Sequence, residues 1–152
     1  MTAPARPEIC NALAIRQAAR HVSQFYDQYL APCGLRGSQF SILARLKFRG
    51  PLSINALAGE LVMDRTTLGR NILPLERERL IEIRSGRSDR RSKELRLTAP
   101  GAARLAEASK RWTEAQARFE KVFGAARAAE LRQLMHEVAT SNLAMGEDAA
   151  RE

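Results

Sequence analysis

The stretch from Ser53 to Leu97, SINALAGELVMDRTTLGRNILPLERERLIEIRSGRSDRRSKELRL, carries the pattern that decides the fold. Ser53 and Asp64 each precede a short segment with apolar residues at helical spacing, and both side chains can accept hydrogen bonds from the free amides at a helix start. The expected inward faces of these two helices are Leu57, Ala58 and Leu61, then Leu68, Ile72 and Leu75. Pro74 is expected to kink the second helix near its end, because proline interrupts the backbone hydrogen-bond ladder.

The apolar period then changes from that of a helix to that of a strand. Ile81–Arg84 and Glu94–Leu97 both alternate apolar and charged residues, as half-buried strands do. A polar link of eight residues, Gly86–Lys93, joins them. This part of the sequence predicts a β-hairpin with a basic tip.

Further helices are predicted before this stretch. One begins near Ile15 and is ended by Pro32 and Gly34. Its apolar face consists of Ile15, Ala18, Ala19, Val22, Tyr26 and Tyr29. Ser38 is expected to cap the next helix, which stops before Pro51. The side chains that this helix buries are Phe40, Leu43 and Leu46.

Two more helices are predicted after the hairpin. Thr98 followed by Pro100 indicates the start of a long helix, and Gly124 ends it. Its apolar residues keep a heptad spacing: Leu105, Ala108, Trp112, Ala115, Phe119 and Val122. The last helix has one apolar side, formed by Leu131, Leu134, Met135, Val138 and Met145.

The chain has 152 residues, of which 45% are hydrophobic and 28% charged, which suits one globular domain. It lacks an apolar run of the roughly 18 residues that a membrane span needs, and its start lacks the hydrophobic stretch of a signal peptide. We therefore expect a cytoplasmic protein without membrane contact. Its two cysteines and two histidines show no zinc-binding spacing, so neither a metal nor another cofactor is expected. Phosphate-binding glycine loops and hydrolase motifs are missing from the sequence, which argues against an enzyme.

Basic side chains are concentrated in one part of the chain. Lys and Arg number 25 against 17 acidic residues, a net charge of +8. Residues 65–96 alone hold ten basic side chains against five acidic ones. Such a cluster is typical of a nucleic-acid-binding surface, although a solvated charged loop is the alternative.

Two short helices followed by a two-stranded hairpin with an arginine-rich tip follow the order of a winged helix-turn-helix. The predicted fold class is therefore mainly α with a small β-hairpin. The chain is expected to form a single domain, 1–152, in which residues 37–98 form a winged lobe that binds DNA. Residues 7–32 and 99–148 are expected to form dimerisation helices.

The second helix of the pair is expected to enter the major groove of duplex DNA, because a helix fits that groove. With its apolar side inward, its outer face carries Thr66, Arg70 and Arg77 beside Thr67 and Gly69. Arg70 can donate two hydrogen bonds to a guanine edge, while Thr66 and Thr67 can contact a thymine methyl group or a phosphate. Arg65 is expected to contact the phosphate backbone.

The hairpin tip is expected to enter the adjoining minor groove, whose negative potential attracts arginine in A·T-rich DNA. Asp89 precedes Arg91 by two positions and can orient its guanidinium through a forked salt bridge, which makes Arg91 the candidate for the minor groove. The candidate DNA-contacting residues are Arg65, Thr66, Thr67, Arg70, Asn71, Arg77, Arg87, Asp89, Arg90, Arg91 and Lys93.

Several of these segments, in this order, resemble the MarR (multiple antibiotic resistance regulator) family of transcription factors. The similar pieces are Ser53-Ile-Asn-Ala-Leu-Ala, Asp64-Arg-Thr-Thr-Leu-Gly-Arg-Asn, Leu75-Glu-Arg-Glu-Arg-Leu-Ile, Asp89-Arg-Arg91 and Leu97-Thr-Ala-Pro-Gly101. Arg79 is a departure, since many members have glycine there. The resemblance implies a homodimer built from the first and last two helices, a palindromic operator in double-stranded DNA, and often release by a small ligand.

A dimer also follows from the apolar residues, since the predicted helices have more apolar surface than a small winged lobe can cover. Packing within the chain is the alternative. A small effector, phenolic or otherwise aromatic, is expected to bind between the dimer helices and the winged lobe, and the candidate residues for it are His21, Tyr26 and Trp112. Ordinary core or interface roles are the alternative for these three.

Two other functions stay open at this point. One is a basic winged protein that coats nucleic acid without sequence preference, and the other is a peroxide sensor that uses Cys10 as its reactive thiol. The residues around Cys10 differ from those of the hydroperoxide sensors of the family, which favours a structural cysteine. Cys33 has no assigned role.

Overall fold

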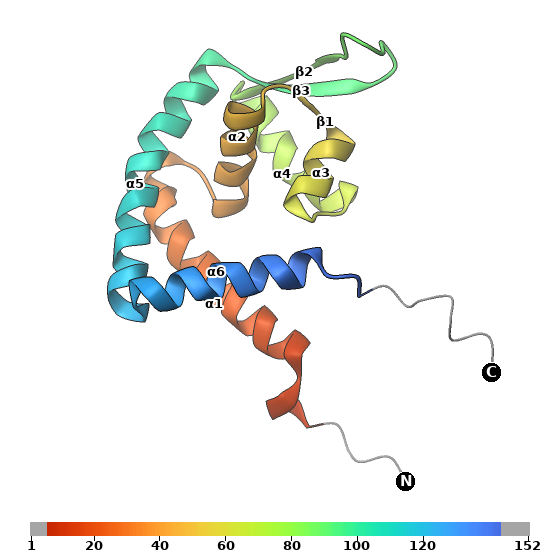
Figure 1. Cartoon of the computed structure of the whole chain (residues 1–152). Helices are drawn as coiled ribbons and strands as arrows, with labels where there is room; N and C mark the ends of the chain where they lie inside the picture. The colour runs from red at the N-terminus through yellow and green to blue at the C-terminus, as the bar shows by residue number, and fades with distance from the viewer. Residues whose placement is uncertain (1–5, 144–152) are drawn as a thin grey trace, which may run out of the picture. The chain divides into compact units, whose positions relative to one another are not determined.

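The computed structural model describes residues 6–143, which contain helices and one small sheet (Figure 1). The elements in chain order are the 3-10 helix η1 (Pro7–Ile9), α1 (Asn11–Leu30), the 3-10 helix η2 (Ala31–Cys33), α2 (Gly37–Arg49), β1 (Leu52–Ser53), α3 (Ile54–Leu61), α4 (Arg65–Arg77), β2 (Ile81–Ser85), β3 (Lys93–Leu97), α5 (Ala99–Phe123) and α6 (Ala125–Thr140). The chain forms two compact units, one up to Gln116 and one from Ala117 onward. The predicted fold class, a mainly helical winged helix-turn-helix, is confirmed.

The sheet has three antiparallel strands in the order β1-β3-β2. Ile83 pairs with Leu95 and Ser85 pairs with Lys93, so Lys93 belongs to β3 and not to the link between the strands. The short strand β1 was not predicted, because two residues are too few to show an alternating pattern. Its Leu52 pairs with Leu95, which adds a third strand to the expected hairpin.

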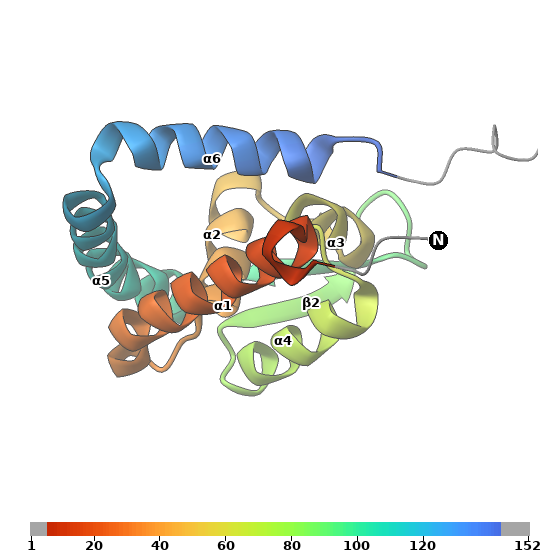
Figure 2. The ribbon, with the colours of Figure 1, turned by 90° about the horizontal axis from the view of Figure 1, so that it is seen from below.

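Most of the core of the first unit is made by apolar residues that the spacing identified, but Leu30 and Ile42 were not among them. The large side chains that are fully buried are Leu30, Ile42, Leu43, Leu57, Leu68, Leu75, Ile81 and Leu95. They come from four helices and two strands, and the helices α2, α3 and α4 gather beside β2 and β3 (Figure 2). Packing of these faces fixes α4 against the sheet.

Three helix starts follow the prediction. Ser53 Oγ accepts a hydrogen bond from the amide of Ala56 at 3.1 Å, and Thr98 Oγ1 accepts one from the amide of Gly101 at 3.0 Å. Asp64 caps α4 in the same way. Each side chain satisfies an amide that the helix leaves without a partner.

The expected cap at Ser38 was wrong. Helix α2 begins at Gly37, two residues earlier than a cap at Ser38 implies, and the Asp27 carboxylate of α1 accepts a hydrogen bond from the Gly37 amide at 2.7 Å. Gln39 Oε1 accepts another from the Arg36 amide at 3.0 Å. Because these two side chains satisfy the helix start, the Ser38 hydroxyl is available for another partner.

The turn between α4 and β2 places Arg79 in the left-handed region, with φ of 57°. An L-residue with a side chain is strained there by steric contact with its own backbone, and glycine is not. The structure therefore explains why glycine is common at this position in the family that the sequence resembles. Helix α4 itself continues through Pro74 to Arg77.

Helices α5 and α6 differ in how much apolar surface they bury. In α5, Leu105, Ala108 and Ala115 are buried. In α6 the apolar side chains of Leu134, Met135 and Val138 are exposed. Met145 and residues 144–148, which were expected to continue this helical region, lie outside the described residues. Within residues 6–143, the structure has no helix that is both long and apolar enough to span a membrane.

Candidate nucleic-acid interface

Asp64 fixes the N-terminus of α4 through two hydrogen bonds. Its Oδ1 accepts from the Thr67 amide at 2.8 Å, and its Oδ2 accepts from the Thr67 hydroxyl at 2.7 Å. Donation from the Thr67 amide holds the pKa of the Asp64 carboxyl below its usual range. The Thr67 hydroxyl is therefore engaged in the cap.

The outer face of α4 is exposed as predicted. Four side chains at helical spacing lie on it: Thr66, Arg70, Leu73 and Arg77. The opposite side is buried through Leu68, Ile72 and Leu75. Leu73, which is 52% exposed, was missing from the candidates. Its spacing of three residues from Arg70 was the signal that could have identified it.

Asn71 lies on the side of α4 that contacts α2. Its Oδ1 accepts a hydrogen bond from the Ser38 hydroxyl at 2.7 Å. Its Nδ2 donates to the Thr67 carbonyl at 2.9 Å. Both polar atoms of the Asn71 amide are thus used within the protein, unlike the guanidinium of Arg70.

The wing is the hairpin of β2 and β3, residues 81–97, and its tip comprises residues 86–92. Gly86 donates to the Ser92 carbonyl at 2.8 Å, and the Ser92 amide and hydroxyl donate to the Asp89 carbonyl at 3.1 and 2.8 Å. The tip extends beyond α3 (Figure 1). These bonds give it a defined turn within an otherwise exposed segment.

The expected forked salt bridge between Asp89 and Arg91 is wrong. Asp89 Oδ1 instead accepts a hydrogen bond from the Arg91 backbone amide at 2.9 Å. A short side chain two positions before an amide reaches that amide more readily than a distant guanidinium, as in Asx turns. Asp89 therefore shapes the backbone of the tip, and the Arg91 side chain has no ion-pair partner within residues 6–143.

The start of α4 and the tip end of the wing meet at one cavity. Its volume is about 420 Å³, and it is lined by Ser53, Ile54, Asn55, Arg65, Arg91, Ser92 and Lys93. No acidic side chain lines it. Three cations around one hollow favour an anion such as a phosphate group.

The candidate cations have no acidic partner among the described residues, whereas seven other arginines of that part of the chain are ion-paired. Among residues 6–143, the ion pairs join Arg45 and Arg49 to Glu60, Arg84 to Glu82, Arg96 to Glu94, Arg104 to Glu78, Arg111 to Glu114 and Arg132 to Glu120. The cations outside these pairs include Arg65, Arg70, Arg77, Arg87, Arg90, Arg91 and Lys93. The ion pairs on β2 and β3 neutralise the two strands of the wing. The positive charge of the wing is therefore concentrated at its tip and at the adjoining Lys93.

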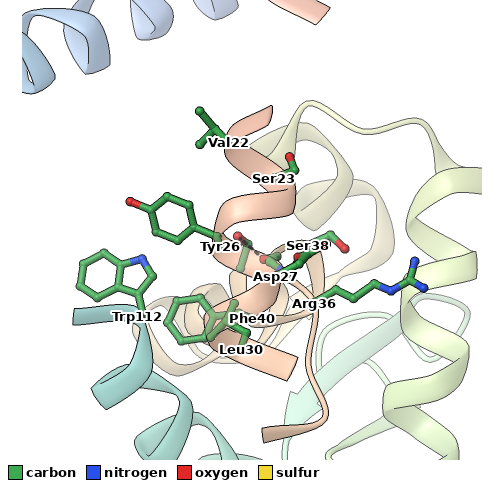
Figure 3. A pocket seen from close by; sticks show the side chains of 11 residues that line it. Val22, Ser23, Tyr26, Asp27, Leu30, Arg36, Ser38, Phe40 and Trp112 are labelled. Carbon is green, nitrogen blue, oxygen red and sulfur yellow. Dashed lines mark hydrogen bonds between the residues drawn. The ribbon is translucent and has the colours of Figure 1, made fainter. Parts of the chain in front are cut away.

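A second cavity, of about 450 Å³, lies between α1, α2 and α5 within the first unit (Figure 3). Tyr26 and Trp112 line it, whereas His21 is exposed and does not. The aromatic wall is completed by Phe40, whose ring stacks on Trp112 with centroids 6.1 Å apart. The cavity also has polar lining residues that were not among the candidates for effector binding: Ser23, Asp27, Arg36, Ser38 and Ser41. The packing of α1 on α2 brings them together, and the sequence alone does not show that packing.

The two cysteines have different surroundings. Cys10 is exposed, and its Sγ accepts a hydrogen bond from the Leu13 amide at 3.4 Å, so it caps α1. Cys33 is buried, and burial raises the pKa of its thiol. A raised pKa keeps Cys33 in the unreactive thiol form. Among the described residues, no group of three or more His, Cys, Asp and Glu could hold a metal ion.

The helix pair α3–α4 with the wing beside it defines a winged-helix protein, and comparison with known proteins identifies its family. A sequence model of the MarR family matches residues 35–93. The M. tuberculosis transcriptional regulator MosR, solved in complex with DNA, is 31% identical with a TM-score of 0.78, and the match covers 94% of this chain and 99% of that one. The chain belongs to the MarR family.

Two other solved structures are similar. The transcriptional repressor CouR, bound to a 23-mer DNA duplex, is 26% identical with a TM-score of 0.78, and the match covers 90% of this chain and 99% of that one. Bordetella bronchiseptica BpsR, whose DNA binding is regulated by 6-hydroxynicotinic acid, is 18% identical with a TM-score of 0.81 over 92% of this chain and all of that one. BpsR at this identity shows the fold alone. No curated protein matches the chain significantly in sequence.

Proposed function

We propose that this protein is a sequence-specific regulator of transcription that binds an inverted repeat in double-stranded DNA as a homodimer. The observation that carries the proposal is the cavity at which Arg65 of α4 and the wing cations Arg91 and Lys93 converge. The exposed face of α4, with Arg70 at its centre, lies on the same helix. Similar structures such as MosR were solved with DNA, which supports the same partner class for this chain.

The two elements have separate tasks in this proposal. Arg70 and Thr66 read base edges in the major groove. Both are exposed, and their side chains have no hydrogen-bond partner among the described residues. Arg87, Arg90 and Arg91 enter the neighbouring minor groove from the wing tip. Arg65 and Lys93 bind phosphates and set the position of the protein on the duplex.

Selection of bound duplexes from a random pool tests sequence specificity. We expect one inverted repeat to be enriched, and to bind roughly a thousandfold more tightly than random duplex at the same salt concentration. A protein that coats nucleic acid would bind both duplexes with equal affinity. Equal affinity would contradict the proposed regulator and favour a protein that coats nucleic acid without sequence preference.

The homodimer is supported by apolar surface that the described residues leave uncovered. Leu134, Met135 and Val138 are exposed on α6, and Ile9 and Ile15 are exposed at the start of the chain. Apolar patches of this kind mark association sites, and an isologous dimer matches the symmetry of an inverted repeat. We expect Leu134→Glu to give monomers in sedimentation, because the interface would bury an unpaired charge. A dimer that persists with this variant and with Val138→Glu would contradict the assignment.

Trp112→Glu would be a poorer test of the dimer than the α6 variants, although Trp112 belongs to the heptad of the predicted long helix. Trp112 is 38% exposed, stacks on Phe40 and lines the cavity of α1, α2 and α5. Loss of this ring would alter the cavity before it altered any interface. The α6 variants avoid this complication.

The cavity beside Tyr26 and Trp112 is the proposed site of a small aromatic effector that releases the operator, so that the protein acts as a repressor. Its volume of about 450 Å³ and its aromatic wall suit a ligand with one ring. Calorimetric titration with 6-hydroxynicotinic acid and with simple phenols tests it against a Ser41→Trp variant that fills the cavity. Equal binding to both proteins would place the ligand elsewhere.

Peroxide sensing through Cys10 has weaker support. The thiol is exposed, but it is used as the cap of α1. We expect operator binding by Cys10→Ser to respond to peroxide as the wild type does. A response that the variant lacks would establish Cys10 as the sensor.

A further inference from the structure

Helix α4 contains a glycine that the packing of the protein does not explain. Gly69 lies inside the helix, where glycine is less favourable than alanine. Its backbone φ is not positive, so its conformation does not require glycine. A Cβ atom built on Gly69 would have no atom of the described chain within 4 Å. Nothing in the described part of the chain therefore requires glycine at this position.

The side of α4 that carries Gly69 faces the wing. Gly69 shares this side with Arg65, four residues earlier, and Glu76, seven residues later. Arg65 lines a cavity of about 420 Å³ with Arg91 and Lys93. Glu76 lines a neighbouring cavity of about 360 Å³ with Lys93 as well. Gly69 thus lies on the side of α4 where Arg65 and Glu76 each share a cavity with Lys93 of the wing.

We infer that Gly69 marks the point at which the sugar–phosphate backbone of the operator crosses α4. This inference rests on the proposed function, in which α4 occupies the major groove and the wing tip the adjoining minor groove. Neighbouring grooves are separated by one sugar–phosphate strand, so that strand must pass between the two elements. The side of α4 that faces the wing is the surface that the strand passes.

The absence of a side chain is what Gly69 contributes. A bare backbone allows the closest approach of another chain, and Arg65 and Lys93, which line one cavity, can neutralise the phosphates. Glycine has no group that could read a base edge, and Gly69 lies to one side of Thr66, Arg70 and Leu73 on the exposed face. Gly69 therefore determines how deeply α4 enters the groove, for every operator sequence alike.

Size variants at two glycines test the inference. Gly59 of α3 is the matched control, because it is also helical and a Cβ there would also meet no atom within 4 Å. We expect Gly69→Ala and Gly59→Ala each to raise the melting temperature by about 2–4 °C, since alanine favours the helix. Operator affinity should fall roughly fivefold for Gly69→Ala and roughly fiftyfold for Gly69→Leu. It should stay unchanged for Gly59→Ala and Gly59→Leu.

A protein that is more stable yet binds DNA more weakly cannot owe the loss to unfolding. The Gly69→Leu loss should be the same for the selected operator and for operators with single base changes, because a backbone strand carries no sequence information. Wild-type affinity in the Gly69 variants would overturn the inference, as would a loss confined to one base position or an equal loss in the Gly59 variants. The wild type is measured first on selected and random duplexes. Equal affinity there would refute the proposed function instead.

Discussion

Ser38 and Asn71 join the cavity to the helix that is proposed to read DNA. Ser38 Oγ, on α2, donates a hydrogen bond to Asn71 Oδ1, on α4, at 2.7 Å. Ser38 also lines the aromatic cavity. Asn71 in turn donates to the carbonyl of Thr67, whose amide and hydroxyl bind the cap Asp64. A continuous series of hydrogen bonds therefore connects the wall of the cavity to the N-terminus of α4.

The first prediction concerns this pair. We expect Ser38→Ala and Asn71→Ala each to weaken operator binding roughly threefold to tenfold, because either change removes the hydrogen bond that joins α4 to α2. The double variant should be no weaker than the single ones, since both remove the same bond. Fluorescence anisotropy with labelled operator measures the effect. Ser41→Ala is the control, because Ser41 lines the same cavity but bonds within α2 to the Gly37 carbonyl. Additive losses would instead favour a direct contact from Asn71 to a base.

Arg70 is predicted to read one base. Arg70→Ala should reduce the preference at a single operator position by about 1–3 kcal/mol, because the guanidinium donates two hydrogen bonds to a guanine edge. Arg70→Lys keeps the charge and loses the fork, so it should recover affinity for random duplex but not the preference. Competition between operators with single base changes measures both. Equal losses on operator and random DNA would contradict base reading.

The wing arginine Arg91 is predicted to bind at the minor groove. Arg91→Ala should weaken binding mainly at A·T-rich flanks and lower the slope of log affinity against log salt by about one unit. Arg84→Ala removes a wing arginine that is paired with Glu82 at 2.9 Å, so it is the matched control and should change the slope less. Titrations at several salt concentrations distinguish the two. An unchanged slope for Arg91→Ala would remove it from the interface.

Gly101 is predicted to be essential for stability. A Cβ at Gly101 would overlap the carbonyl oxygen of Leu80, which already accepts hydrogen bonds from the amide and hydroxyl of Thr98. Gly101→Ala should therefore lower the free energy of unfolding by at least about 2 kcal/mol, because backbone cannot move aside as a flexible side chain can. Urea unfolding measures it, with Gly59→Ala as the control for helix propensity. A variant as stable as the wild type would show that α5 can shift.

The strained turn at Arg79 gives a prediction of opposite sign. Arg79→Gly should raise the free energy of unfolding by about 0.5–1 kcal/mol, since φ of 57° costs glycine nothing. Arg79→Ala keeps the strain and should leave stability nearly unchanged, which separates the backbone effect from loss of the side chain. Thermal unfolding of both variants provides the comparison. Equal stabilisation by the two would assign the effect to charge.

The sequence by itself determined the elements and their inward faces. Apolar spacing located Leu68, Ile72 and Leu75 on one side of α4, and Ser53, Asp64 and Thr98 marked three helix starts. These features are local. A helix repeats every 3.6 residues and a cap bonds to an amide two or three positions away, so both can be recognised within a short window.

Only the tertiary structure decided which side chains were already occupied. Ser38 was expected to cap a helix, but its hydroxyl donates to Asn71, 33 residues away. The Asp27 carboxylate of α1 accepts the hydrogen bond from the first amide of α2 instead. Packing of α4 beside the sheet also placed Arg65 and Lys93 around one cavity. Partners so distant along the chain are chosen by how the helices pack, and the spacing of residues within one helix contains no information about its neighbours.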